Sequence, residues 1–137
     1  MACYWPPVQR VIDHSCFQLV ESKNLTTPGH YDYADPFSEE NFPGQFDPNQ
    51  YRAPQRYLDL QAIPSEKPIA KNFVVGELMQ DWKGQYGLFS NLAMLQIQAL
   101  RNEVNTPVIV NSGYRSPGYN STLSGAAKWS RHMYGDA

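Results

Sequence analysis

The distribution of proline is the feature that most restricts the fold of this chain. Nine of its eleven prolines lie within residues 1–68, and only Pro107 and Pro117 follow. Proline has no backbone N–H and is excluded from helix interiors and central strands. Uninterrupted elements before residue 68 are therefore limited to about a dozen residues. We expect short elements and turns there, and the longest regular element after it.

One stretch of the proline-rich half contains no proline and is long enough for a longer element. From Val8 to Lys23 the sequence reads VQRVIDHSCFQLVESK, with apolar residues at mixed spacings of three and four. This spacing favours an amphipathic helix, with a bent strand as the alternative.

Residues 26–55 combine turn-forming residues, carboxylates and aromatic side chains. A segment of this composition buries too little apolar surface for a core of its own, but it is too aromatic for a solvated linker. Its aromatic residues include Phe37, Phe42, Phe46, Tyr51 and, just beyond the segment, Tyr57. We therefore interpret residues 1–68 as an extended arm or propeptide-like segment that lies on its own domain or on a neighbouring subunit. That segment would be the surface for a protein partner or for homo-oligomerisation.

The composition changes after Pro68, so we place a separate domain at residues 69–137. A short apolar run at residues 73–79, FVVGELM, precedes a turn-like DWKGQYG. Residues 88–104 show the strongest helical periodicity, which ends before Pro107. Their apolar face comprises Phe89, Leu92, Ala93, Ile97, Leu100 and Val104, opposite Asn91, Gln98, Arg101 and Asn102.

Two shorter elements are predicted beyond this helix. Val108 to Val110 is a continuous apolar run that indicates a buried strand. Ser116 followed by Pro117 is typical of a helix start, so residues 117–123 should form a short helix closed by Gly125.

Charge and hydropathy exclude several classes of function. The 137 residues suit one ordinary domain, and the net charge is −2. No stripe of Lys and Arg is present, so nucleic-acid binding is not expected. The N-terminus lacks the apolar run of a signal peptide, and no segment is long and apolar enough to span a membrane.

Three blocks near the end of the chain carry the functional information. They are SGYRSPGYN at residues 112–120, GAA at 125–127 and SRHMYGDA at 130–137. Together with the lead-in from about Lys71, they resemble the M15 family of zinc peptidases. These are D-Ala-D-Ala carboxypeptidases and endolysin-type peptidases that cut peptidoglycan stem peptides and share a metal-site architecture with the hedgehog signalling domain.

This resemblance implies a fold, a cofactor and a site. The fold would be α+β, with helices packed on a small antiparallel sheet. His132 matches the first zinc ligand of the signature HxxGxAxD, and Arg115 matches the arginine that binds and polarises the substrate. Ser112, Tyr114 and Ser130 would bind the substrate.

The residue types fit these roles. Imidazole is a good zinc ligand, and a glycine three residues later lets the backbone turn so that a second ligand can face the same ion. The planar guanidinium of Arg115 suits a substrate carboxylate or a developing oxyanion. The alternatives are that Arg115 ties loops together through carbonyl groups, and that His132 binds no metal.

The signature is incomplete within the sequence. Its aspartate would fall beyond Ala137, and the family's second histidine ligand and its glutamate base lie further still. Asp136 is a poor substitute because the family has a variable residue there. A catalytic zinc needs three protein ligands, so the chain as written is expected to be inactive. Either the natural chain continues, or the ordered part stops here, or the domain is a remnant.

Two functions are therefore expected from the sequence. The first is a zinc-dependent peptidase acting on D-amino-acid bonds of peptidoglycan, cytoplasmic until released or virion-associated, with the cell envelope as its site of action. The alternative is a structural or assembly protein, for example a virion component, that retains a truncated M15-like domain.

Overall fold

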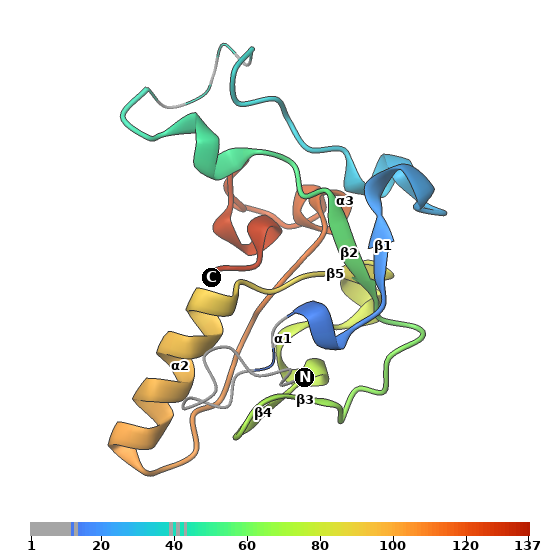
Figure 1. The fold of residues 1–137 in the computed structure, drawn as a ribbon. Coiled ribbons are helices and arrows are strands. Elements are labelled where there is room, and N and C mark those ends of the chain that lie inside the picture. Colours follow the sequence, from blue (N-terminus) through green and yellow to red (C-terminus); the bar gives the residue numbers. More distant parts are fainter. Residues whose placement is uncertain (1–11, 13, 39, 41, 43) are drawn as a thin grey trace.

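The protein folds as an α+β structure with two small antiparallel sheets, as the sequence predicts. The computed structural model describes residues 12, 14–38, 40, 42 and 44–137. Figure 1 shows their arrangement. The strands are β1 (Leu19–Glu21), β2 (Arg56–Asp59), β3 (Pro68–Ala70), β4 (Phe73–Val74) and β5 (Tyr86–Gly87).

α-Helices and 3-10 helices connect and cover these strands. The α-helices are α1 (Val75–Leu78), α2 (Asn91–Val104) and α3 (Pro117–Ser121). Short 3-10 helices are η2 (His14–Cys16), η3 (Ser22–Asn24), η4 (Pro28–Tyr31), η5 (Pro48–Tyr51), η6 (Asp81–Lys83) and η7 (Arg131–Tyr134). Within the described part of the chain, none of these helices has the length and hydropathy to cross a membrane.

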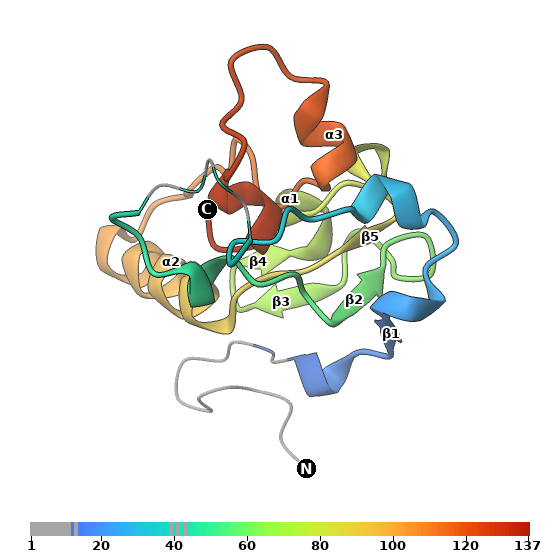
Figure 2. The same cartoon turned by 90° about the horizontal axis from the view of Figure 1, so that it is seen from above.

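The larger sheet draws its strands from both sides of Pro68. Its order is β1-β2-β5, and all neighbours are antiparallel, with Leu58 of β2 opposite Leu19 of β1 and Gly87 of β5. Strands β3 and β4 form a separate two-stranded sheet. Figure 2 shows β1, β2 and β5 side by side, with α3 and the C-terminal segment on one side of the molecule.

The main core is likewise shared by residues from before and after Pro68. Tyr31 is an example, since its hydroxyl accepts from the Tyr86 N–H at 2.6 Å and donates to the Tyr86 carbonyl at 2.7 Å. The buried members are Phe17, Tyr31, Tyr57, Leu58, Leu60, Ile69, Ala70, Phe73, Val75, Met79, Tyr86, Phe89, Met94 and Tyr114.

A second, smaller cluster joins residues 42–51 to residues 129–134. Phe42 contacts the rings of Tyr51 and Trp129 edge to face, and Tyr51 contacts Tyr134 in the same way. Phe37 and Phe46 remain about half exposed. The proline-rich segment therefore packs part of its aromatic surface against the same region that carries the motifs.

The helix predicted for residues 8–23 is wrong over the part that the structure describes. Residues 8–11 and 13 lie outside the described residues, while residues 14–24 form η2, β1 and η3 in succession. Val20 pairs with Tyr57 of β2. Pairing with a distant strand overrides the weak helical spacing, which is a tertiary effect that local periodicity does not contain.

The helix predicted for residues 88–104 is confirmed as α2, beginning at Asn91. Ser90 caps its first turn by accepting from the Ala93 N–H at 3.2 Å, and Asn105 ends it in the left-handed conformation with φ 50°. The predicted division into faces is only partly right, because Gln98 is fully buried while Leu92 is 55% exposed. Gln98 is satisfied inside by hydrogen bonds to Asn72 and Asn102.

The strand predicted at Val108–Val110 is also wrong. This segment connects α2 to α3 without joining a sheet, and Ile109 is 81% exposed. Val108 and Val110 pack against the core, so alternate side chains face inward without a strand partner. The predicted start of the next helix is confirmed, since the Ser116 hydroxyl accepts from the Tyr119 N–H at 3.1 Å and Pro117 is the first residue of α3.

Candidate functional site

The segment Ser112–Ser116 is held in place by backbone contacts with other parts of the chain. The Tyr114 N–H donates to the Leu78 carbonyl at 2.8 Å, and the Arg115 N–H donates to the His132 carbonyl at 3.1 Å. Gly113 is packed so closely that a Cβ there would collide with the carbonyl oxygen of Leu78. Glycine is therefore required for this approach of two backbones.

Arg115 and His132 are brought together by this segment, and Ser130 lies between them. The Ser130 hydroxyl accepts from an Arg115 guanidinium nitrogen at 3.3 Å and from the His132 backbone N–H at 3.3 Å. The second of these contacts caps η7. Three of the residues that the motifs single out thus form one connected group, although the sequence separates Arg115 from Ser130 by fifteen positions.

The imidazole of His132 is oriented by a backbone carbonyl. Its Nδ1 lies 2.8 Å from the Gly113 oxygen, and a carbonyl oxygen can only accept a hydrogen bond. Nδ1 therefore carries the proton, and in the neutral ring Nε2 keeps its lone pair. Histidines that ligate metals usually make such a hydrogen bond with the other ring nitrogen, which fixes the tautomer and the ring orientation.

Gly135 shapes the chain just after His132. It adopts φ 78°, in the left-handed region, and a Cβ at this position would collide with the side chain of Leu88. Its carbonyl accepts from the Ser90 N–H at 2.8 Å, at the start of α2. The glycine that the signature places three residues after the histidine thus ties η7 to the N-terminus of α2.

Tyr114 is buried, and its hydroxyl meets Tyr33 rather than solvent. The two hydroxyl oxygens are 2.9 Å apart, and Tyr33 donates to the Met133 carbonyl at 2.6 Å. Since the Tyr33 proton is used there, Tyr114 is the donor between the two hydroxyls. Burial raises the pKa of both tyrosines above the usual value. The hydroxyl of Tyr114 is therefore bonded to Tyr33 in the interior of the protein.

Ser112 lies at the other end of the segment and contacts Lys83. The Lys83 ammonium donates to the Ser112 hydroxyl at 3.4 Å, and Lys83 is only 6% exposed. Sequence reasoning missed both Lys83 and Tyr33, because each comes from a region that reads locally as a turn. No local signal marks them, since both act through contacts with distant residues.

The residues that the structure describes do not form a complete metal site. No group of three or more His, Cys, Asp or Glu side chains suited to a metal ion occurs among the residues that the structure places. Asp136 is engaged elsewhere, in a two-point contact with Arg131 at 2.9 Å and 2.6 Å. His132 therefore fits a ligand position, while the residues present do not form the full set.

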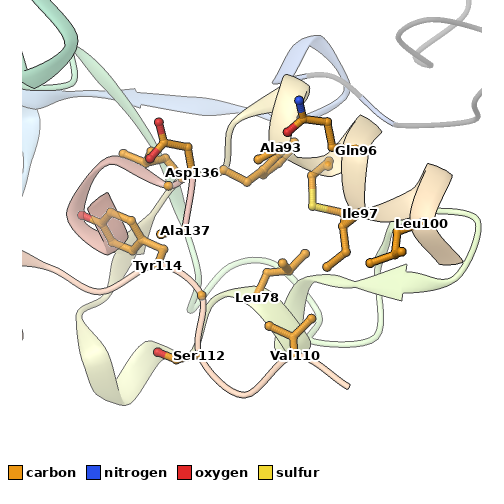
Figure 3. Close-up of a pocket in the computed structure, with 15 residues that line it drawn as sticks. Leu78, Ala93, Gln96, Ile97, Leu100, Val110, Ser112, Tyr114, Asp136 and Ala137 are labelled. Atoms are coloured by element: carbon orange, nitrogen blue, oxygen red, sulfur yellow. The ribbon is translucent and has the colours of Figure 1, made fainter. Parts of the chain in front are cut away.

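A largely aliphatic cavity of about 380 Å³ borders the site. Figure 3 shows side chains of α2 along one side, Leu78 and Val110 facing them, and Asp136 and Ala137 at one end. Ser112, Gly113 and Tyr114 form part of its wall, so one face of the motif segment lines this cavity. Arg115, Ser130 and His132 are not among its lining residues.

Comparison with known proteins agrees with the motifs. Residues 71–137 match the family model described as Peptidase M15. Neither the curated proteins nor the solved structures contain a significant match to this chain. The family match covers the segment Ser112–Ser116, which carries Arg115, and also Ser130 and η7, which contains His132. The C-terminal part of this chain, residues 71–137, therefore belongs to the peptidase M15 family.

Proposed function

We propose that this protein is a zinc-dependent peptidase that acts on peptidoglycan stem peptides, at a bond involving a D-amino acid. The family match supports peptidase function in general. The zinc ion and the peptidoglycan substrate are proposed in addition. The observation that carries it is the Nδ1 contact of His132 with the Gly113 carbonyl, which presents Nε2 as a metal ligand beside Arg115.

In this proposal each residue of the group has one task. His132 takes one position on the zinc ion, and Ser130 fixes both its backbone and the guanidinium of Arg115. Arg115 binds the substrate and stabilises negative charge near the bond that is cut. Its Nε is buried without a hydrogen-bond partner among the described residues, so the guanidinium keeps an N–H donor for a ligand.

The remaining ligands are assigned outside the described residues, because those residues do not provide them. The proposed setting is the cell envelope, reached after release from the cytoplasm or as part of a virion.

The test compares zinc binding and cleavage in matched histidine variants. His132→Gln removes the proposed ligand, whereas His30→Gln removes an imidazole outside the Arg115 group. We expect His132→Gln alone to weaken zinc binding, measured by competition with a coloured chelator. In the natural protein, where this proposal requires the remaining ligands to be present, release of muropeptides from purified peptidoglycan should be lost in His132→Gln and Arg115→Met, with unchanged thermal unfolding. Zinc binding that is equal in all variants would refute the assignment of His132.

A structural or assembly role is the second candidate. The observation that favours it is the lack of a complete metal-binding group among the described residues. Here residues 1–68 would contact a protein partner or a second copy. This role predicts that the natural protein neither binds zinc at His132 nor releases muropeptides, and that Arg115→Met leaves its assembly state unchanged in light scattering.

A further inference from the structure

Lys83 contacts both ends of the segment Ser112–Ser116. Its ammonium donates to the Ser112 hydroxyl at 3.4 Å, while its backbone carbonyl accepts from the Ser116 hydroxyl at 2.7 Å and from the Ser116 N–H at 3.3 Å. Ser116 is completely buried, so the second contact is shielded from water. Gly84, at φ 139°, lets the chain turn away directly after Lys83. The position of Lys83 is thus fixed by the motif segment itself.

Lys83 and Arg115 are two positive charges that have no carboxylate partner among the residues that the structure describes. Lys83 is more than nine-tenths buried, and buried lysines are normally paired. Among the residues that the structure describes, neither Lys83 nor Arg115 forms an ion pair with a carboxylate, whereas Arg131 does. Burial lowers the pKa of Lys83, and the nearby charge of Arg115 lowers it further.

The two cations destabilise the folded protein when no anion is bound near them, and a bound anion would stabilise it. A buried cation lacking a counter-ion pays the full desolvation cost, and a second cation nearby adds repulsion. An anion bound between the two would reverse both effects. The Ser112 hydroxyl already accepts from Lys83, so its own proton is available for donation to such an anion.

We propose that Lys83 is a substrate-binding residue which, together with Arg115 and the Ser112 hydroxyl, binds a carboxylate group of the peptide. This inference rests on the proposed peptidase function and adds to it a preference for acidic peptides. The carboxylate belongs either to the C-terminus of the peptide or to an acidic side chain. Trp82 borders the group, with its ring centre 5.2 Å from the Lys83 ammonium, and it is 65% exposed.

Three short peptides distinguish the sources of the carboxylate. The probes are N-acetyl-D-alanyl-D-alanine, its C-terminal amide, and N-acetyl-D-alanyl-D-glutamate with the C-terminus amidated. Binding to the full chain is measured by titration calorimetry. A charge-assisted hydrogen bond contributes about 1.5–3 kcal/mol, or about 10-fold to 100-fold in affinity. At least one acidic peptide should therefore bind about tenfold tighter than the neutral one, and which one does so identifies the source.

Variants of Lys83 show whether the preference for acidic peptides depends on its charge or on its packing. Lys83→Met should abolish the preference for the acidic peptide, and Lys83→Arg should keep most of it. Lys71→Met removes a lysine at the exposed turn between β3 and β4 and should change nothing. A measurement on the unmodified protein covers the case in which Lys83→Met does not fold. Binding of the acidic peptide should raise the pKa of the Lys83 ammonium, followed by NMR, while the amide should leave it unchanged.

Several results would overturn this inference without touching the proposed function. Equal affinity for acidic and neutral peptides, no binding of any probe, or an unchanged preference in Lys83→Met would each exclude the assigned role. So would an unchanged Lys83 pKa on binding of the acidic peptides. Zinc binding at His132 does not involve Lys83, so failure of the peptidase proposal shows in the histidine variants instead.

Discussion

The Nδ1 of His132 lies 2.8 Å from the carbonyl oxygen of Gly113, across nineteen positions of sequence. This contact helps to join the first and third motif blocks and sets the direction in which the imidazole faces. It depends on Gly113, whose backbone lies against that of Leu78 with no room for a side chain. The orientation of the proposed ligand therefore depends on a residue that carries no functional group.

Gly113→Ala should destabilise the protein and displace His132. The new methyl group would collide with the Leu78 carbonyl, and forced overpacking of this kind typically costs about 1–3 kcal/mol. Urea unfolding measures the change in the free energy of unfolding, and the imidazole NMR signals of His132 report its displacement. Gly29→Ala is the control, because a Cβ there has no neighbour within 4 Å and the change should be nearly neutral. Equal stabilities of the two variants would contradict the packing at Gly113.

Tyr33→Phe should destabilise the protein, because Tyr33 forms hydrogen bonds with residues next to the site. It would remove the donor to the Met133 carbonyl and the acceptor for the Tyr114 hydroxyl. Leaving buried polar groups unpaired costs about 1–3 kcal/mol, so the midpoint of urea unfolding should fall. Tyr134→Phe is the matched control, since the Tyr134 hydroxyl is buried and has no partner among the described residues. Its removal should be neutral or slightly stabilising, and a larger loss than for Tyr33→Phe would refute this difference.

Stability should decline at alkaline pH as buried tyrosines ionise. Burial raises the pKa of Tyr57 and Tyr134 from the usual 10 to about 12. Between these values the unfolded chain releases protons that the folded protein retains, so the free energy of unfolding falls as pH rises. The stabilisation is complete below about pH 10 and is lost as the pH passes through 12. Unfolding measured from pH 8 to 11 should show a shallower decline for Tyr134→Phe than for the unmodified protein, and identical slopes would exclude a contribution from Tyr134.

Much of the local structure near the motifs could be predicted from the sequence. The capping pattern at Ser116 and Pro117 gave the start of α3, and apolar periodicity gave α2 to within a few residues at its start. These signals are local, because capping and helical spacing act within a turn or two. The motif blocks also indicated which residues would gather, and the structure brings Arg115, Ser130 and His132 together.

Contacts between distant residues could not be predicted in this way. The strand order β1-β2-β5 depends on pairing between segments about 30 to 40 residues apart, and Lys83 meets Ser112 from a turn 29 positions away. In each of these pairs, the sequence around one partner contains no pattern that identifies the other. The apolar run Val108–Val110 is the opposite case, with a strong local signal that finds no strand to pair with.

Gln98 shows why the buried face of α2 departs from its apolar pattern, and it allows a direct test. Its amide lies in the interior and bonds to the backbone and side chain of Asn72 and to Asn102. Gln98→Leu keeps a side chain of similar bulk but leaves the Asn72 N–H without its acceptor, so it should cost about 1–3 kcal/mol and lower the melting temperature. Gln96→Leu makes the same change on the exposed side of the helix and should stay within about 0.5 kcal/mol. If Gln98→Leu were as stable as the unmodified protein, apolar packing would offset the lost hydrogen bonds, and the polar contact between α2 and the β3–β4 turn would not be needed for stability.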